Sequence, residues 1–162
     1  MISERDVSHM RKAEALREHS TDKSRKVGCV LASADGTILA EGWNAFPPGV
    51  EDRPERHARP DKYDFTEHAE RCAVADAASR GVALAGSTAY VRWFPCCDCG
   101  RMLVMSGVTR IVCRDPDLND PNYGRGFANL LKICEERNVA VDFYPFPDPD
   151  PQVRTRDEDL TF

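Results

Sequence analysis

The stretch TEHAERCAVADAASRGVALAGSTAYVRWFPCCDCGRMLVMSG, at residues 66–107, decides the fold. Its alanine-rich segment His68–Arg80 ends before a glycine and predicts a helix. The segment Thr88–Val91 predicts a short strand. Pro95–Ser106 predicts a second helix, with proline in its first turn and a glycine after its end. A strand between two helices is typical of an α/β domain.

The segments on either side extend this architecture. Apolar residues recur at helical spacing over Glu4–Arg17, and Asp35-Gly36 joins the apolar runs Val27–Ala32 and Thr37–Ala40 in a predicted hairpin. Further along the chain we expect a strand at Thr109–Cys113, a helix at Asn129–Arg137 and a strand at Val139–Tyr144. Strands that alternate with helices after a hairpin predict a three-layer α/β fold with a mixed sheet.

The composition excludes several classes of protein. The chain has 162 residues, of which 41% are hydrophobic and 30% charged, as in one globular domain. No apolar run approaches the roughly 18 residues of a membrane span, and the N-terminus carries no signal segment. We therefore expect a cytoplasmic protein that contacts no membrane. The net charge of -5 argues against binding along a long nucleic acid.

Two regions depart from the regular pattern. Prolines and charges in residues 44–66 argue against a regular element, and so long a loop in a compact domain is usually functional. Proline alternates with other residues in 145–151, and charges follow. We expect one folded domain over residues 1–144 and a proline-rich acidic tail over 145–162, either free or clasping a neighbouring subunit.

A metal site is predicted where the two central helices begin. Cys96 and Cys99 lie three residues apart and project from one face of a first helical turn, within reach of a single tetrahedral ion. His68 supplies a third ligand if the helices lie side by side. Three protein ligands leave one position for water, as in catalytic zinc sites. Glu70 is then placed to take a proton from that water and pass it to a leaving group.

The other reactive and aromatic side chains have plainer interpretations. We expect packing rather than metal binding for the remaining cysteines, Cys29, Cys72, Cys97, Cys113 and Cys134. His9 and His19 are expected to be solvated. His57 is expected to be an ordinary residue of the long loop, and closing over a substrate or binding a second metal is its less favoured alternative. Two sets stay open: Trp43, Trp93 and Phe94 as pocket wall or core, and Arg53, Arg56 and Arg59 as solvated loop or phosphate contacts.

The metal motif has a known signature. H-x-E followed by P-C-x-x-C is typical of zinc nucleobase deaminases, and both halves are present here in order. Residues 20–28 resemble the S-x-D-x-S-x-x-V-G segment of deoxycytidylate deaminases, and 41–49 their G-Y-N-G-x-P-x-G loop. Residues 61–63 are similar to the K-Y-P before their zinc histidine. The sequence therefore resembles the cytidine and deoxycytidylate deaminase superfamily over residues 7–144.

The resemblance implies a cytidine deaminase-like fold with a five-stranded mixed sheet, one zinc per chain, and water attack at C4 of cytosine with release of ammonia. It implies that His68, Cys96 and Cys99 bind the zinc and that Glu70 shuttles the proton. The expected substrate contacts are Asn44 at the sugar, Ser24 and Lys26 near a phosphate, and Ala69 and Pro95 in the pocket.

The resemblance favours conversion of dCMP to dUMP but leaves other substrates open. Pro48 and Cys72 stand where the family usually has a polar residue and an asparagine. A free nucleobase such as cytosine or guanine, a nucleoside, or a pterin or riboflavin precursor remains an alternative, and tRNA editing is disfavoured by the acidic charge. A non-catalytic zinc-stabilised scaffold is the alternative of another class, against which Glu70 argues. We also expect a homo-oligomer, since related deaminases complete their pockets at subunit interfaces.

Overall fold

The computed structural model describes residues 1–146 of the chain. Its helices are α1 (Glu4–Leu16), α2 (Lys62–Phe65), α3 (Ala69–Ser79), α4 (Cys97–Met105) and α5 (Gly124–Glu136), with 3-10 turns at Arg17–His19 and Pro54–His57. Its strands are β1 (Gly28–Ala32), β2 (Ile38–Trp43), β3 (Thr88–Val91), β4 (Arg110–Cys113) and β5 (Ala140–Phe143).

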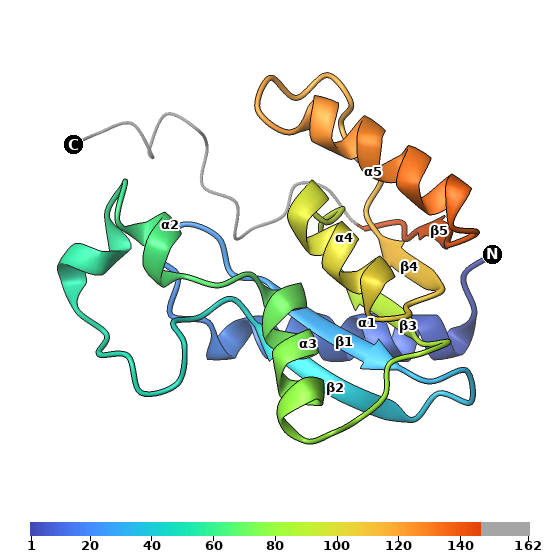
Figure 1. The fold of residues 1–162 in the computed structure, drawn as a ribbon, viewed down its shortest axis with the longest axis horizontal. Coiled ribbons are helices and arrows are strands. Elements are labelled where there is room, and N and C mark those ends of the chain that lie inside the picture. Colours follow the sequence, from blue (N-terminus) through green and yellow to red (C-terminus); the bar gives the residue numbers. More distant parts are fainter. Residues whose placement is uncertain (147–162) are drawn as a thin grey trace.

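The five strands form one mixed sheet in the order β2-β1-β3-β4-β5. Strand β1 runs antiparallel to both of its neighbours, whereas β3, β4 and β5 are parallel. Figure 1 shows α1 behind the sheet and α3 and α4 in front of it. The predicted three-layer α/β fold is therefore confirmed, and the carboxyl ends of β2, β3 and β4 share one edge of the sheet.

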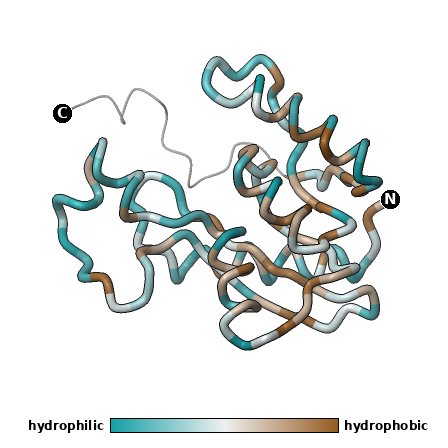
Figure 2. The backbone as a smooth tube through the Cα atoms, in the orientation of Figure 1, coloured by the Kyte–Doolittle hydropathy of each residue, from teal (hydrophilic) through white to brown (hydrophobic). Residues whose placement is uncertain are grey.

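The sheet separates two apolar layers. All five residues of β1 are buried because successive side chains point to opposite faces. Val30 packs with Met10 and Leu16 of α1, and Leu31 packs on the other side with residues of α3 and α4. Figure 2 shows hydrophobic residues concentrated in the central strands and a largely hydrophilic loop between β2 and α3. Burial of these faces fixes the helices that carry the predicted ligands.

A glycine allows α3 to lie directly on β2. A methyl group at Gly42 would lie 2.4 Å from both the carbonyl oxygen of Ala69 and the amide nitrogen of Ala73. Such distances are impossible without moving the helix, so only glycine fits at this crossing. The small alanines of α3 complete the close contact, since Ala69 and Ala73 are fully buried. This contact places the first turn of α3 at the carboxyl edge of the sheet.

Two predicted boundaries and one predicted loop differ in the structure. Helix α5 begins at Gly124 rather than Asn129, and β2 continues through Trp43. The loop over residues 44–66 contains a 3-10 turn and the four-residue helix α2, where no regular element was expected. Its turns form around proline and aspartate, which favour local turns in otherwise polar segments.

The prediction that His9 is solvated is wrong. Its side chain is buried, its Nε2 donates to the carbonyl of Gly36 at 2.9 Å, and its ring stacks on Tyr90. The reason is that the buried face of α1 includes polar residues that find partners inside. Asp6 is another, since it accepts hydrogen bonds from Tyr90 and Arg110.

Two further expectations concern the C-terminal tail and the cellular location of the protein. The predicted tail lies almost wholly outside the described residues, so its role as a clasp stays a prediction. Within residues 1–146, no helix combines the length and the apolar character that crossing a membrane requires. The cytoplasmic location stays a prediction from the sequence.

Candidate active site

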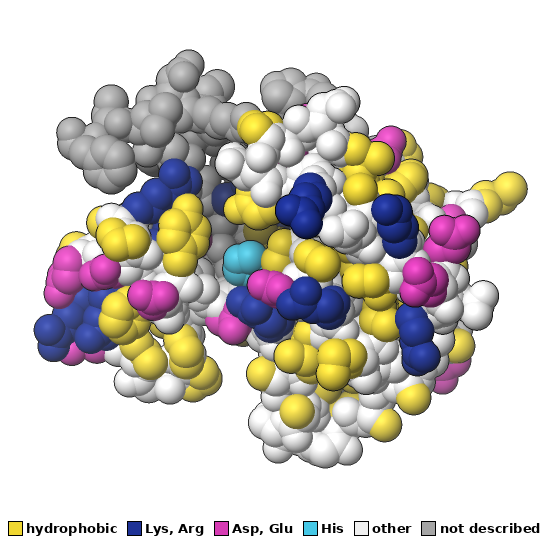
Figure 3. Space-filling model, turned by 45° about the horizontal axis from the view of Figure 1, so that its top comes forward, with side chains coloured by type: hydrophobic (Ala, Val, Ile, Leu, Met, Phe, Trp, Pro, Cys, Tyr) yellow, Lys and Arg dark blue, Asp and Glu magenta, His cyan; other side chains and the backbone are white. Residues whose placement is uncertain are grey.

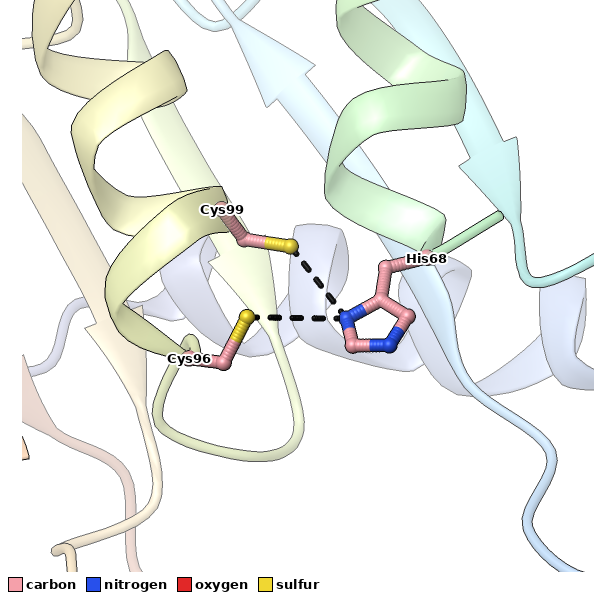
Figure 4. A group of neighbouring side chains, drawn as sticks. All are labelled: His68, Cys96 and Cys99. Atoms are coloured by element: carbon pink, nitrogen blue, oxygen red, sulfur yellow. Dashed lines mark hydrogen bonds between the residues drawn. The ribbon is translucent and has the colours of Figure 1, made fainter. Parts of the chain in front are cut away.

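The predicted ligands meet where α3 and α4 begin. His68 and Cys96 are the residues that precede the two helices, and both have extended backbones. Cys99 lies in the first turn of α4 and is fully buried. Figure 4 shows the two cysteine side chains pointing from α4 toward the imidazole ring. The side-by-side arrangement expected from the sequence is present.

The distances in this cluster suit a tetrahedral ion. Nδ1 of His68 lies 3.6 Å from Sγ of Cys96 and 3.3 Å from Sγ of Cys99. All three ligand atoms lie within 4.8 Å of one another. Tetrahedral zinc, with bonds of about 2.0 Å to nitrogen and 2.3 Å to sulfur, separates such ligands by roughly 3.6 Å. His68, Cys96 and Cys99 therefore form a candidate zinc site, since one imidazole nitrogen and two sulfurs are ligands that zinc prefers.

The hydrogen bonds within the cluster favour a negatively charged thiolate, which a cation requires as a ligand. The Cys99 thiol donates toward Cys96 and, with His68, lowers the pKa of Cys96 to about 4. The same contact raises the pKa of Cys99, and the hydrogen bond with Cys96 raises the pKa of His68. One thiol of the pair is thus held as a thiolate by donors on either side. A divalent cation would replace those protons.

Glu70 lies in the first turn of α3, two residues after the histidine. Its side chain is buried, with 6% of the residue exposed, and burial raises the pKa of the carboxyl. Its charge also interacts with those of His68 and Cys96. A carboxylate with raised proton affinity beside a metal site suits proton transfer.

Asn44 is buried and joins the two loops that border the cluster. Its Oδ1 accepts from the amide of Val27 at 2.7 Å, and its Nδ2 donates to the carbonyl of Arg25 at 2.8 Å. Its own backbone carbonyl accepts from the hydroxyl of Ser20. The side-chain amide therefore fixes the segment that leads into β1, and the second N–H of Nδ2 has no acceptor among residues 1–146.

Of the two predicted phosphate contacts, the side chain of Ser24 already has partners in the protein. The hydroxyl of Ser24 donates to Asp22 and lies in very short contact with the ammonium of Lys62. Lys62 also pairs with Asp22 at 3.0 Å, which ties the long loop to the body. Lys26 lines a small surface pocket of about 230 Å³ beside Asp22, Lys23 and Ser24. Sequence reasoning missed Lys62, whose role depends on a partner 40 residues away.

The loop arginines and His57 mainly stabilise the loop itself. Arg53 pairs with Glu51, and Arg56 and Arg59 lie over the rings of Phe65 and Tyr63. The ring of His57 stacks on Phe46, and its Nε2 hydrogen-bonds to Asp52 at 2.5 Å. These contacts favour the interpretation that the three arginines and His57 are ordinary loop residues. A second metal at His57 has no support among the described ligand clusters.

The aromatic residues near the cluster divide between core and surface. Phe94 is buried in the core against Phe127, and Trp43 contacts His19. The half-buried ring of Trp93 instead has three guanidinium groups within 6 Å, those of Arg25, Arg92 and Arg114. Ala69 and Pro95, the other predicted pocket residues, are fully buried beside the helix starts.

The remaining cysteines follow the predictions. Cys29, Cys113 and Cys134 are buried in the core. Cys72 is half-buried, burial raises its pKa to about 11, and it lies outside the ligand cluster. Cys97 is half-buried on the other side of the α4 start and lies outside the ligand cluster.

One charged pair beside the cluster was not predicted. The carboxylate of Glu67 accepts from the backbone amide of His68 and from the guanidinium of Arg71. Their spacing of four residues around the motif is the signal that could have identified them. Figure 3 shows one histidine side chain on one exposed face, with basic and acidic side chains beside it. Hydrophobic side chains border the same region, so the face around the cluster is mixed in character.

A three-layer α/β domain with a His–Cys–Cys cluster at two helix starts defines a metal-binding class of protein. Comparison with known proteins makes the assignment specific. Residues 3–114 match the family model of the cytidine and deoxycytidylate deaminase zinc-binding region, which is more than half of the chain. The chain belongs to the cytidine and deoxycytidylate deaminase family, a class of hydrolytic zinc deaminases.

Individual proteins that resemble this chain belong to the same family. A probable deoxycytidylate deaminase of Caenorhabditis elegans is 35% identical over 106 residues, which are 63% of this chain and 53% of that protein. The chain thus spans about half the length of this relative. A probable deoxycytidylate deaminase of Drosophila melanogaster is 26% identical over 155 residues, which are 83% of this chain and 75% of that protein.

A solved structure shares the fold at nearly full length. The crystal structure of dCMP deaminase from the cyanophage S-TIM5, in complex with dCMP and dUMP, superposes with a TM-score of 0.70. The two sequences are 26% identical, and the match covers 89% of this chain and 99% of the phage protein. The predicted cytidine deaminase-like fold is confirmed by this similarity.

Proposed function

We propose that the protein is a zinc-dependent hydrolytic deaminase that converts dCMP to dUMP and releases ammonia. The single observation that carries this proposal is the cluster of His68, Cys96 and Cys99 with the buried Glu70 beside it. In this reaction one water molecule adds at C4 of the cytosine ring. The bond from C4 to the amino nitrogen breaks, and a carbonyl remains at C4.

His68, Cys96 and Cys99 would hold one zinc per chain. When bound, zinc supplies Lewis-acid chemistry that makes a nucleophile of water near neutral pH. The helix starts favour the two thiolates, because each helix N-terminus carries partial positive charge. Two thiolates and a neutral imidazole leave the site with little net charge, so a separate base is needed for the proton.

Glu70 is the catalytic residue in this proposal. Its carboxylate takes a proton from the attacking water and delivers it to the leaving amino nitrogen, so that ammonia departs as a neutral molecule, and the second proton of the water ends on ring nitrogen N3 as the C4 carbonyl forms. The burial that raises its pKa makes both transfers easier, since the acid and base forms are closer in free energy. An amide at this position can neither accept nor return the proton.

The remaining predicted residues are proposed to hold the nucleotide. Asn44 has a second N–H on Nδ2 that can donate to the sugar. Ala69 and Pro95 are small or rigid residues at the two helix starts, where the base would lie closest to the metal. Ser24 and Lys26 lie on the approach to β1, at the same edge of the sheet. The names of the two animal relatives and the phage structure favour dCMP among possible substrates.

A panel of substrates tests this proposal directly. Zinc-loaded protein is incubated with cytosine, cytidine, deoxycytidine, dCMP, dCTP, guanine and adenosine, and ammonia release is followed. We expect kcat/KM for dCMP to exceed that for deoxycytidine at least about thirtyfold, the effect of losing hydrogen bonds to a charged group. Equal turnover of deoxycytidine or a free base would contradict dCMP specificity. No ammonia from any compound would favour a zinc-stabilised scaffold.

A further inference from the structure

An arginine cluster lies next to the candidate active site and belongs to none of the predicted phosphate contacts. The guanidinium of Arg25 lies 4.8 Å from the centre of the Trp93 ring, and that of Arg114 lies 5.3 Å from it. The three residues come from three separate loops: the approach to β1, the turn after β3 and the loop after β4. With Arg92 at 5.8 Å, three cations surround one ring, which is unexpected in a chain of net charge -5.

The position of this cluster ties it to the metal ligands. Trp93 stands three residues before Cys96, so their Cα atoms are at most about 11 Å apart. On its other side, the backbone carbonyl of Arg25 accepts the hydrogen bond from Asn44. Arg25 therefore stands between the proposed sugar contact and the turn that leads to the zinc ligand.

The side chain of Arg25 is suited to bind an anion. Arg25 is exposed, and among residues 1–146 its side chain has a ring contact but no ion pair. Stacking on an indole holds the guanidinium plane while its N–H donors point outward. Such a pre-oriented fork matches the oxygens of a phosphate. Arg53, by contrast, already pairs with a carboxylate of its own loop.

The indole of Trp93 is a second, independent indication that a ligand binds between the segment leading into β1 and the turn after β3. Its indole N–H is buried and has no acceptor among the described residues. Buried donors without partners are rare in folded proteins. An anion held by the neighbouring guanidinium would supply an acceptor at this corner.

We propose that Arg25, held over Trp93 beside Arg114, binds the 5′-phosphate of the nucleotide substrate. This inference rests on the proposed function and names a specificity-determining residue for it. It assigns phosphate recognition to the corner between the β1 approach and the turn after β3, rather than to the arginines of the 44–66 loop.

Binding of the reaction product tests the assignment without relying on turnover. Calorimetry measures the Kd of dUMP and of deoxyuridine for the zinc-loaded parent and for Arg25→Gln. We expect the variant to bind dUMP about ten- to a hundredfold more weakly, because a hydrogen-bonded charge is lost. Deoxyuridine, which lacks the phosphate, should bind both proteins within about twofold. The Kd of dUMP for Arg25→Lys should lie between those of the parent and Arg25→Gln, because lysine keeps the charge but lacks the two parallel N–H donors of the guanidinium.

Matched controls separate this role from a structural one. Arg137→Gln changes an exposed arginine at the end of α5, near the opposite edge of the sheet, and should bind dUMP like the parent. Zinc content and the thermal midpoint should be the same in all four proteins. Equal weakening of dUMP and deoxyuridine by Arg25→Gln would show that Arg25 shapes the pocket, and an unchanged Kd for dUMP would show that it contacts no phosphate. Either result overturns the inference.

Ammonia release by the parent protein tests the proposed function separately from the role of Arg25. A parent that releases no ammonia from dCMP refutes the proposed reaction. A parent that deaminates dCMP, with a variant that keeps its affinity for dUMP, refutes only the assignment of Arg25.

Discussion

Sγ of Cys99 lies 3.3 Å from Nδ1 of His68, although 31 positions separate the two residues in the chain. The contact exists because α3 and α4 pack side by side on the sheet and begin at the same edge. No segment of either helix alone brings three ligands together. The candidate metal site is thus a product of the crossover connections between parallel strands.

The first prediction concerns the metal. Protein prepared without chelator should contain one zinc per chain by elemental analysis, and Cys99→Ser should lose it, because a serine hydroxyl is a poor zinc ligand. Cys97→Ser is the matched control, since Cys97 lies in the same helical turn but outside the cluster. Less than about half an equivalent in the parent, or retained zinc in Cys99→Ser, would refute the site.

The second prediction concerns proton transfer. Glu70→Gln should keep its zinc and its fold but lose about 10²- to 10⁴-fold in kcat, the usual contribution of a general acid–base group. Ammonia release and elemental analysis measure the two properties together. Glu136→Gln, at the exposed end of α5, should match the parent. Turnover of Glu70→Gln within about tenfold of the parent would show that another group moves the proton.

The third prediction concerns stability and pH. Asp6 is buried, and Arg110 donates to it at 2.6 Å. Burial alone raises the pKa of Asp6, but hydrogen bonds from Arg110, Ser3 and Tyr90 outweigh it and lower the pKa well below its ordinary value. The ion pair therefore stabilises the fold fully above the unfolded-state pKa of about 3.9, and this stabilisation is lost as the pH falls toward the folded-state pKa.

Urea unfolding of Asp6→Asn tests this pair. At pH 7 the variant should be less stable by about 3 kcal/mol, because Arg110 is left without its buried partner. The difference from the parent should narrow as the pH falls below about 4, where the Asp6 carboxyl of the unfolded parent begins to bind a proton while that of the folded parent stays ionised. A difference that stays constant from pH 7 to pH 3 would show that the ion pair is not its cause. Asp64→Asn, in the exposed α2, serves as the control.

The fourth prediction concerns assembly. We expect a homo-oligomer, and α4 exposes two methionines one turn apart, with Met105 84% and Met102 41% exposed. Burial of such apolar side chains between subunits would stabilise association. Light scattering at micromolar concentration measures the mass. A monomer with full activity at that concentration would contradict the prediction.

The sequence alone predicted most of the helices and strands and the candidate metal ligands. Alanine-rich and apolar runs ended by glycines placed α3, β3 and α4 within one or two residues, because helix and strand propensity is local. The three-residue spacing of Cys96 and Cys99 fixed a shared face of one helical turn. His68 followed from the order of strands and crossovers, which leaves few ways to connect parallel strands.

Only the tertiary structure decided which polar groups meet. The burial of His9, the double hydrogen bond of Asn44 and the contact between Arg25 and Trp93 each join segments far apart in the chain. Their residue types allow both a solvated and a packed position, with similar local propensities. The choice depends on which partners the sheet brings within a few ångströms, because a buried polar group is stable only when it finds a partner.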